Sequence, residues 1–462
     1  MHKLKITWLV LAAFIFFETG AASAQEAKTF FDEHQYSKAI QALLAKSADL
    51  SGLSNGEMVQ LGGAYMRRGY MLRDLAALQI RVGRDYYFDR DTSKAAKRFA
   101  LTPYFLGRYL YESGEYAPAL KALQRAGRGL TGADAERCQI WIGACQQQSG
   151  KTAEANAAWS KVSAGLAGEL AYARAAAGLK SEGKCGSGSS LADLRCRLWA
   201  AAQQNISLPE LNKLQTALLN STAADAEQKF EQNYIQKFYD PATPQILAHA
   251  DFAAAAEVFS RYKAAKGREP ANYYAGVSAY EAGDDTRART FLQQTNLPQK
   301  DIYLGAIAFR SGQRAEAGQK WQAFPGANEA IALEWAEVTS RLVKNAEPIL
   351  ALHQKHLNAA SAKMELALPL GRALAQVQRY EEALEVMQAA YPESRKDQMR
   401  YIEPAFLLTL AQVKYDLWAR QYFIEILGHI ACLREAYPVT LGVLDIAQGI
   451  FTPRIKEGKK IR

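Results

Sequence analysis

Histidines and acidic side chains in this sequence of 462 residues do not gather into an obvious reactive group. His353 and His356 stand three residues apart after Pro348, and on a helix this spacing places both imidazoles on one face. A metal site there needs a further carboxylate or thiolate ligand, and none is evidently placed to supply it. We therefore expect a solvated helix face at these histidines.

The most polar cluster is RDYYFDRD, residues 84–91, which sets Asp85, Asp89 and Asp91 beside two tyrosines. Such a group could bind a cation or a sugar, but the pattern is more typical of an irregular polar loop. The sequence carries no HExxH and no GxGxxG motif. Apart from the repeated helix pattern described below, it also has no second domain large enough to be a lytic transglycosylase. We predict no enzymatic activity, and therefore no catalytic residue, cofactor or metal.

Five cysteines are present. Cys185 and Cys196 bracket the stretch GSGSSLADLR, whose flexible start could let the loop close on itself, so this pair is the favoured disulfide. Cys138 and Cys145 are two helical turns apart, about 10.5 Å along a helix axis, and cannot bond to each other. We expect them to be small core residues, and leave other cysteine pairings open.

The first 24 residues have the pattern of a cleaved export signal. A basic head with Lys3 and Lys5 precedes an apolar run, Ile6 to Phe17, that is too short to span a bilayer comfortably. Ala22–Ala24 then offers the small residues that signal peptidase reads, with Gln25 as the first mature residue. We expect an exported protein, periplasmic if the source is bacterial; an uncleaved anchor is the alternative.

The net charge of the chain indicates which kinds of partner it could attract. The formal net charge is +9, and much of the excess lies in the final PRIKEGKKIR. This basic tail could attract an anionic envelope polymer or a membrane surface, or it could be a solvated tail. Nucleic acid is not an expected partner of an exported chain. With 49% hydrophobic residues and only 14 prolines, the composition favours a helical globular protein.

One stretch, YFLGRYLYESGEYAPALKAL (104–123), shows how the helices are organised. Gly107 falls in the middle of an expected helix, and Gly114, seven residues later, ends it in a left-handed turn. Ala119 and Leu123 then lie on a second helix, where the alanine allows a close contact and the leucine fills the space between helix pairs. The result is an antiparallel helix pair that must stack on similar pairs.

The pattern returns along the chain. Its copies are QIWIGACQQQSGKTAEANAAW (139–159, with Gly143, Gly150, Ala155 and Trp159), NYYAGVSAYEAGDDTRARTFL (272–292, with Gly276, Gly283, Ala288 and Leu292), IYLGAIAFRSGQRAEAGQKW (302–321, with Gly305, Gly312, Ala317 and Trp321), LPLGRALAQVQRYEEALEVM (368–387, with Gly371, Ala383 and Met387) and a first helix, VQLGGAYMRRG (59–69, with Gly62, Tyr65 and Gly69). In the copy at 368–387, Gln378 replaces the turn glycine. Second helices alone are expected at EHQYSKAIQALLAK, with Ala39 and Leu43, and at ADFAAAAEVFSRYKAA, with Phe252 and Phe259.

The spacing of the copies supports a repeat. Gly143 and Gly276 are separated by close to four units of about 34 residues, and Gly305 and Gly371 by close to two. The gap from Gly62 to Gly107 fits only with an insertion, for which residues 81–94 are the candidate.

This pattern resembles the tetratricopeptide repeat, which places Leu-Gly, Tyr, Gly, Tyr, Ala and a large apolar residue at these offsets. The resemblance covers most of residues 30–400. It implies an all-α fold, an α-solenoid of antiparallel helix pairs in a right-handed superhelix. We expect a signal peptide (1–24), a first array (25–180), a linker with an irregular helical segment (181–243), a second array with capping helices (244–440) and the basic tail (441–462). Whether residues 181–190 form a hinge stays open.

The resemblance also implies an inner wall built from each first helix, with a concave face that binds partners. Transferring the family's inner-wall positions gives Tyr104, Arg108, Tyr111, Glu112, Tyr273, Tyr280, Glu281, Phe309, Arg310, Arg372, Met66 and Arg67. Tyrosine and arginine are the side chains that dominate protein-binding hot spots. The tyrosines could instead pack between repeat units. The Lys and Asn set of the family's carboxylate clamp for chaperone tails is absent, so that activity is not carried over.

The leading interpretation is a non-catalytic exported scaffold that binds protein partners of a cell-envelope assembly, secretion or polysaccharide-export machine. The alternatives are a cell-wall or glycan-binding module that uses the aromatic groove, and an accessory domain of a peptidoglycan-active complex. Partner identity and oligomeric state are not encoded in any motif we find.

Overall fold

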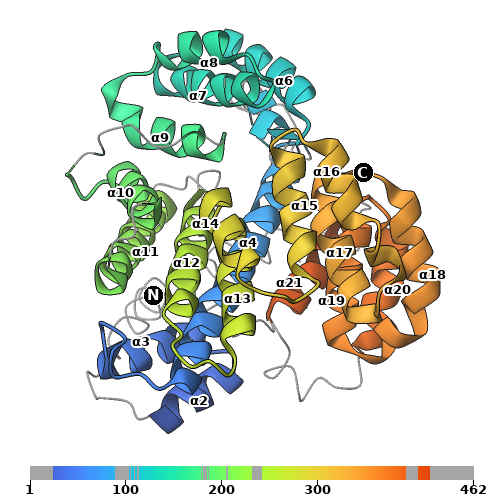
Figure 1. Cartoon of the computed structure of the whole chain (residues 1–462). Coiled ribbons are helices and arrows are strands. Elements are labelled where there is room, and N and C mark those ends of the chain that lie inside the picture. Colours follow the sequence, from blue (N-terminus) through green and yellow to red (C-terminus); the bar gives the residue numbers. More distant parts are fainter. Residues whose placement is uncertain are drawn as a thin grey trace, which may run out of the picture.

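The computed structural model describes residues 24–88, 103–104, 106–108, 110–111, 114–177, 179, 185, 187–203, 207–231, 242–391 and 404–416. Every regular element in these ranges is a helix (Figure 1), so the predicted all-α class is confirmed. In the same ranges, no helix combines the length and the apolar character needed to cross a membrane. The predicted basic tail and all but the last residue of the predicted signal lie outside the described residues, as do 417–440 of the expected capping helices.

The helices of the first half are α2 (Ala24–Asp32), α3 (Tyr36–Lys46), α4 (Asn55–Phe88), α6 (Tyr116–Gly129), α7 (Gly132–Gln148), α8 (Thr152–Trp159), α9 (Ala167–Ala176), α10 (Leu191–Gln203) and α11 (Leu208–Glu231). Those of the second half are α12 (Ala242–Ser260), α13 (Arg268–Glu281), α14 (Asp285–Gln293), α15 (Lys300–Arg310), α16 (Arg314–Trp321), α17 (Glu329–Leu342), α18 (Ala346–Ala362), α19 (Met364–Gln376), α20 (Tyr380–Ala390) and α21 (Pro404–Asp416). Short 3-10 turns, η2 (Ala164–Leu166) and η4 (Phe324–Gly326), precede α9 and α17.

One turn geometry joins the helices of successive hairpins. At Gly312 the backbone is left-handed, with φ of 82°, and its N–H donates to the Phe309 carbonyl. The N–H of Gln313 reaches back to the carbonyl of Ala308, which completes a Schellman motif. The same paired hydrogen bonds and positive φ recur at Gly114, Gly150, Gly283, Gln378 and His34. The predicted left-handed turn is thus confirmed, and Gln378 adopts it without being a glycine.

The mid-helix glycines provide the close contact expected of them. A Cβ built on Gly305 would lie 2.4 Å from Nε1 of Trp321, so no side chain fits there while the indole keeps its place. The equivalent pairs are Gly107 with Leu123, Gly143 with Trp159, Gly276 with Leu292 and Gly371 with Met387. Both indoles also donate to a carbonyl three residues before their glycine: Trp159 to Ile140 at 2.9 Å and Trp321 to Ile302 at 3.0 Å.

The prediction that a helix ends at Gly69 is wrong. Helix α4 runs on to Phe88. The polar stretch that starts at Arg84 is therefore helical as far as Phe88 and is not an irregular loop. Asp89 and Asp91 lie outside the described residues. Gly69 lies within the helix because it allows a close contact between α4 and another helix, α12. Gly69 faces Phe252, and a Cβ on Gly69 would lie 3.0 Å from its ring.

Helix α4 pairs with α12, far along the chain, instead of with the next helix in sequence. Gly62 faces Phe259 as Gly69 faces Phe252, so the two helices run antiparallel. Next to Gly69 and Phe252, both carboxylate oxygens of Asp251 accept hydrogen bonds from Arg68, at 2.7 and 2.8 Å. Asp251 is fully buried, which makes this a bidentate ion pair away from water.

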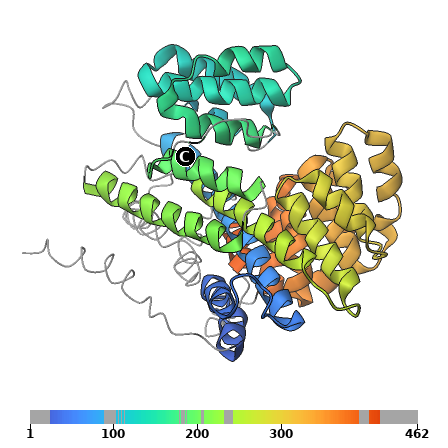
Figure 2. The same cartoon turned by 60° about the vertical axis from the view of Figure 1, so that its left-hand side comes forward.

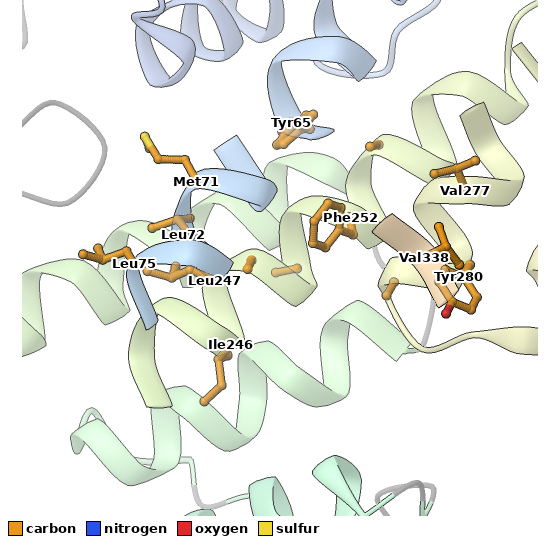
Figure 3. Close-up of a cluster of buried hydrophobic side chains, with 14 of the residues drawn as sticks. Tyr65, Met71, Leu72, Leu75, Ile246, Leu247, Phe252, Val277, Tyr280 and Val338 are labelled. Carbon is orange, nitrogen blue, oxygen red and sulfur yellow. The ribbon is translucent and has the colours of Figure 1, made fainter. Parts of the chain in front are cut away.

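Buried apolar side chains surround the α4–α12 helix pair. Figure 3 shows Leu72 and Leu75 of α4 near Leu247 of α12, and Phe252 of α12 between these and a group formed by Val277 and Tyr280 of α13 with Val338 of α17. Helices α10 and α11 also contact α12, and α21 contacts α4. Figures 1 and 2 show α6–α9 gathered at one end of the molecule and α13–α20 gathered beside α4.

We expect Gly305→Ala to lower the free energy of unfolding by about 1–3 kcal/mol, because the added methyl group must displace the Trp321 indole. Gly318→Ala on α16 is the matched control: no atom lies within 4 Å of a Cβ built there. Helix propensity should make that control neutral or slightly stabilising. Urea unfolding followed by circular dichroism measures both, and equal losses would contradict the close contact.

Candidate functional site

The tyrosines predicted to line a binding wall lie between helices. Tyr104, Tyr111, Tyr273 and Tyr280 are each at most 8% exposed. Burial raises the pKa of Tyr104, Tyr273 and Tyr280 above the usual value for a phenol. These rings contribute to packing between helices and do not form an open wall.

In the first half, the rings form a row with one aromatic side chain on each of several helices. Tyr111 meets the edge of Trp141 at 5.1 Å between ring centroids, and Trp141 meets Tyr172 at 5.9 Å. Tyr172 contacts Trp199 at 5.8 Å, and Trp199 stacks on His249 of α12 at 3.8 Å. This aromatic row therefore runs from Tyr111 back to His249 of α12.

The predicted Arg108 lies on this row. Its guanidinium carbon is 3.4 Å from the centroid of Trp141, a cation–π contact. Arg137, on the same helix as Trp141, binds both oxygens of Glu169 at 3.1 Å. The predicted Glu112, which follows Tyr111 in the sequence, lies outside the described residues.

In the second half, buried tyrosines surround a carboxyl group. Tyr273 and Tyr303 both donate to Oε1 of Glu334, the latter at 2.9 Å. Burial raises the pKa of Glu334, although the two hydroxyl groups oppose that shift. Tyr280 lies beneath Arg310, whose guanidinium carbon is 4.1 Å from the ring centroid and which also pairs with Asp285.

The predicted Glu281 belongs to a cluster of charges between α4 and the second half. It accepts hydrogen bonds from Arg73 of α4 at 3.0 Å and from Arg341 of α17 at 2.9 Å. Burial disfavours the ionised form, but the charges of Arg341 and Arg73 outweigh it and lower the pKa of Glu281 to about 2. Because the folded-state pKa is depressed, this carboxylate stabilises the fold above about pH 4.5, and the gain is lost as pH falls toward 2.

The predicted Arg372 belongs to the same cluster, on α19. It pairs with Asp74 of α4 and with Glu337 of α17, the latter at 3.0 Å, and donates to the Thr409 hydroxyl of α21 at 3.2 Å. Gln412 donates to the Asp74 carbonyl at 2.8 Å. We name Arg73, Asp74, Glu281, Glu337, Arg341 and Arg372 the inner charge cluster. It ties α4 to α13, α17 and α19.

The remaining predicted residues are the more accessible ones. Arg310 is exposed and Phe309 is half-buried against Trp321, at 5.9 Å between ring centroids. Arg67 is exposed above the ring of Phe31, and Met66 is half-buried. These two groups lie on α15 and α4.

The expectation of a solvated face at His353 and His356 is wrong. Both imidazoles are buried, because α18 packs against α17, α19 and α20. His353 lies 3.7 Å from Glu385, and His356 lies 3.8 Å from Glu329. Burial lowers the pKa of His353. Each histidine thus has a different carboxylate, and among the described residues no group of acidic, histidine or cysteine side chains could hold a metal ion.

The cysteines match the sequence analysis. Cys185 and Cys196 are joined, with Cα atoms 5.5 Å apart. Cys138 and Cys145 are buried and unbonded, and burial raises the pKa of each thiol to about 12. At that pKa they are neutral thiols at physiological pH, which favours the packing role over a reactive one.

Two stretches that approach known catalytic or nucleotide-binding motifs were not recognised from the sequence alone. Residues 52–56 read GLSNG, the GxSxG spacing of a serine-hydrolase nucleophile. In the structure Ser54 caps α4: its backbone N–H donates to the Glu57 carboxylate at 2.9 Å, and the Glu57 N–H donates to the Ser54 hydroxyl at 3.3 Å. This is a capping box, so the motif serves the helix start.

Residues 178–185, GLKSEGKC, approach a P-loop, but Cys185 stands where that motif needs Ser or Thr and is bonded to Cys196.

Comparisons with known proteins give no relative. No protein-family model, no curated protein and no solved structure matches this chain.

We expect Glu281→Gln to destabilise the protein by about 3–5 kcal/mol, because it leaves two half-buried guanidinium groups without their shared carboxylate. Asp301→Asn is the control, since the Asp301 carboxylate is 37% exposed and pairs only with Lys320 in the described contacts. That control should cost less than about 1 kcal/mol. Urea unfolding at neutral pH compares them. Similar losses in both variants would show that the inner charge cluster adds little.

His249 should make stability depend on pH. Burial lowers the pKa of His249 from 6.5 to about 4, so between these values the unfolded chain binds a proton that the folded chain does not. The free energy of unfolding therefore falls as pH falls, by about 2 kcal/mol more from pH 7 to pH 5 than without this group. His249→Phe keeps a ring on Trp199 and removes the titration. Unchanged pH dependence in the variant would contradict the assignment.

Proposed function

We propose that this chain is a non-catalytic, exported scaffold that resembles tetratricopeptide repeat proteins and binds protein partners of an envelope assembly, secretion or polysaccharide-export machine. One observation carries the proposal: the same helix hairpin, with a left-handed turn, a buried alanine and a glycine facing a large side chain, recurs along the chain. Stacked hairpins of this kind offer extended surfaces for other proteins.

Contacts between the hairpins support a solenoid. In the second half, α13 contacts α14 and α15, α15 contacts α16 and α17, and α17 contacts α18 and α19. Helix α19 then contacts α20 and α21. Each first helix thus contacts its own second helix and the first helix of the next pair, which is the neighbour pattern of a repeat array.

The structure narrows the choice of binding residues. Glu281 and Arg372 are engaged by α4, and the predicted tyrosines are buried, so these side chains are poorly placed to reach a partner. Arg310 and Phe309 of α15 are the more accessible of the predicted wall residues in the second half. We therefore place the protein-binding face of the second half at α15.

Glycan binding through an aromatic groove is the weaker alternative. Sugar stacking needs the faces of aromatic rings to be open, and Tyr104, Tyr111, Tyr273 and Tyr280 are covered by neighbouring helices. Export rests on the N-terminal sequence pattern alone.

A photoreactive residue placed at Arg310 in the mature full-length chain should crosslink a discrete protein in the native envelope fraction. The same residue at Gln388, exposed on the outer helix α20, is the control and should give little product. The crosslinked mixture is resolved by electrophoresis and mass spectrometry. Equal labelling at both positions, or none at residue 310, would remove the proposed face.

A further inference from the structure

Helix α6 carries a basic stripe with no acidic residue. Lys121, Arg125 and Arg128 are exposed and follow one another at intervals of four and three, which puts them on one helix face. The helix, YAPALKALQRAGRG, contains no Asp or Glu. In Figure 1, α6 lies on the rim of the molecule, at the end formed by α6–α9.

Some arginines and lysines of other hairpins are held in ion pairs. On α14, Arg287 pairs with Glu257 at 3.2 Å, and on α16, Lys320 pairs with Asp301 at 3.0 Å. Within the described contacts, no carboxylate lies in ion-pair range of Lys121, Arg125 or Arg128. Like charges at these helical spacings repel each other, and only Arg128 lies in the last turn, where a cation is favourable for the helix.

The surroundings of the stripe indicate what it binds. A specific protein interface is centred on a buried aromatic or apolar anchor. The large apolar side chains that the described part of the chain exposes are Val59 on α4 and Tyr274 on α13, and neither is on α6. The other exposed residues of α6 are Ala117, Pro118, Gln124 and Gly129. A cationic face without an anchor fits a surface that supplies many anionic groups and no pocket.

We propose that the α6 stripe docks the protein on an anionic phospholipid bilayer, through the lipid headgroups. From Lys121 to Arg128 the stripe covers about 10.5 Å of the helix axis, and its long side chains can spread over neighbouring headgroups. The +9 net charge of the chain adds long-range attraction to the same surface. The contact is electrostatic and peripheral, so it weakens as salt rises. This docking is separate from the protein-binding face at α15.

The test measures binding of the full-length mature chain to sucrose-loaded vesicles by sedimentation. Vesicles contain either phosphatidylcholine alone or phosphatidylcholine with about one third phosphatidylglycerol. We expect binding to the anionic vesicles only, and a marked loss between low and high salt. Since each basic residue near the surface contributes about a fivefold gain in partitioning, Lys121→Gln with Arg125→Gln and Arg128→Gln should weaken binding about a hundredfold.

The chain offers a matched control. Lys263 and Lys266 lie between α12 and α13, and Arg268 begins α13; all three are exposed and have no carboxylate partner among the described contacts. Changing all three to Gln removes the same charge from another place and should weaken binding only a few fold. Thermal unfolding checks that both triple variants remain folded. If the α6 triple is unfolded, the single change Arg125→Glu replaces it and should weaken binding at least as much as Arg125→Gln.

Three results would overturn the proposal. Equal losses of vesicle binding in the two triple variants would mean that binding depends on the net charge of the protein and not on the α6 stripe. Equal binding to neutral vesicles would exclude headgroup charge. Binding to soluble polyglutamate but not to anionic vesicles would assign the stripe to an acidic polypeptide. The crosslinking at residue 310 is scored separately, so failure of either proposal leaves the other standing.

Discussion

The pairing of α4 with α12 is the contact on which the rest of the structure depends. Gly62 and Gly69 remove side-chain bulk from α4 at the places where Phe259 and Phe252 lie, and this lets the two helices approach closely. Arg68 and Asp251, 183 residues apart in sequence, meet beside the Gly69–Phe252 contact, where the Asp251 carboxylate is away from water. A buried ion pair adds little net stability but penalises any other register, because a shifted pairing would leave both charges unpaired.

Through this pairing α4 becomes part of both halves of the molecule. On one side, α11 contributes Gln215, whose amide donates to Asp251 at 2.7 Å, and Asn212, which donates to the Tyr65 hydroxyl at 2.9 Å. On the other side, the inner charge cluster joins α4 to α13, α17 and α19. Glu281 and Arg372, two of the charged positions predicted for a binding wall in the second half, are therefore satisfied from within the chain.

Features set by neighbouring residues could be predicted from the sequence, and long-range features could not. The turn at Gly312 and the fit of Gly305 to Trp321 depend on residues within one hairpin, so fixed offsets reveal them. Gly69 follows the same spacing rule, yet its partner is Phe252, and no local pattern distinguishes it from a turn glycine. The burial of His353 also depends on neighbouring helices, whose approach the spacing of two histidines does not encode.

The α4–α12 contact also has a consequence for the order of folding. The hairpins α15–α16 and α19–α20 can form as soon as each is synthesised, since their partner residues are close in sequence. Helix α4 cannot cover its glycine face until α12 has been made, and the loop closed by that contact is long, which slows its formation. The N-terminal part of the chain therefore completes its packing late, and a nascent chain that stops before residue 242 leaves that face of α4 open.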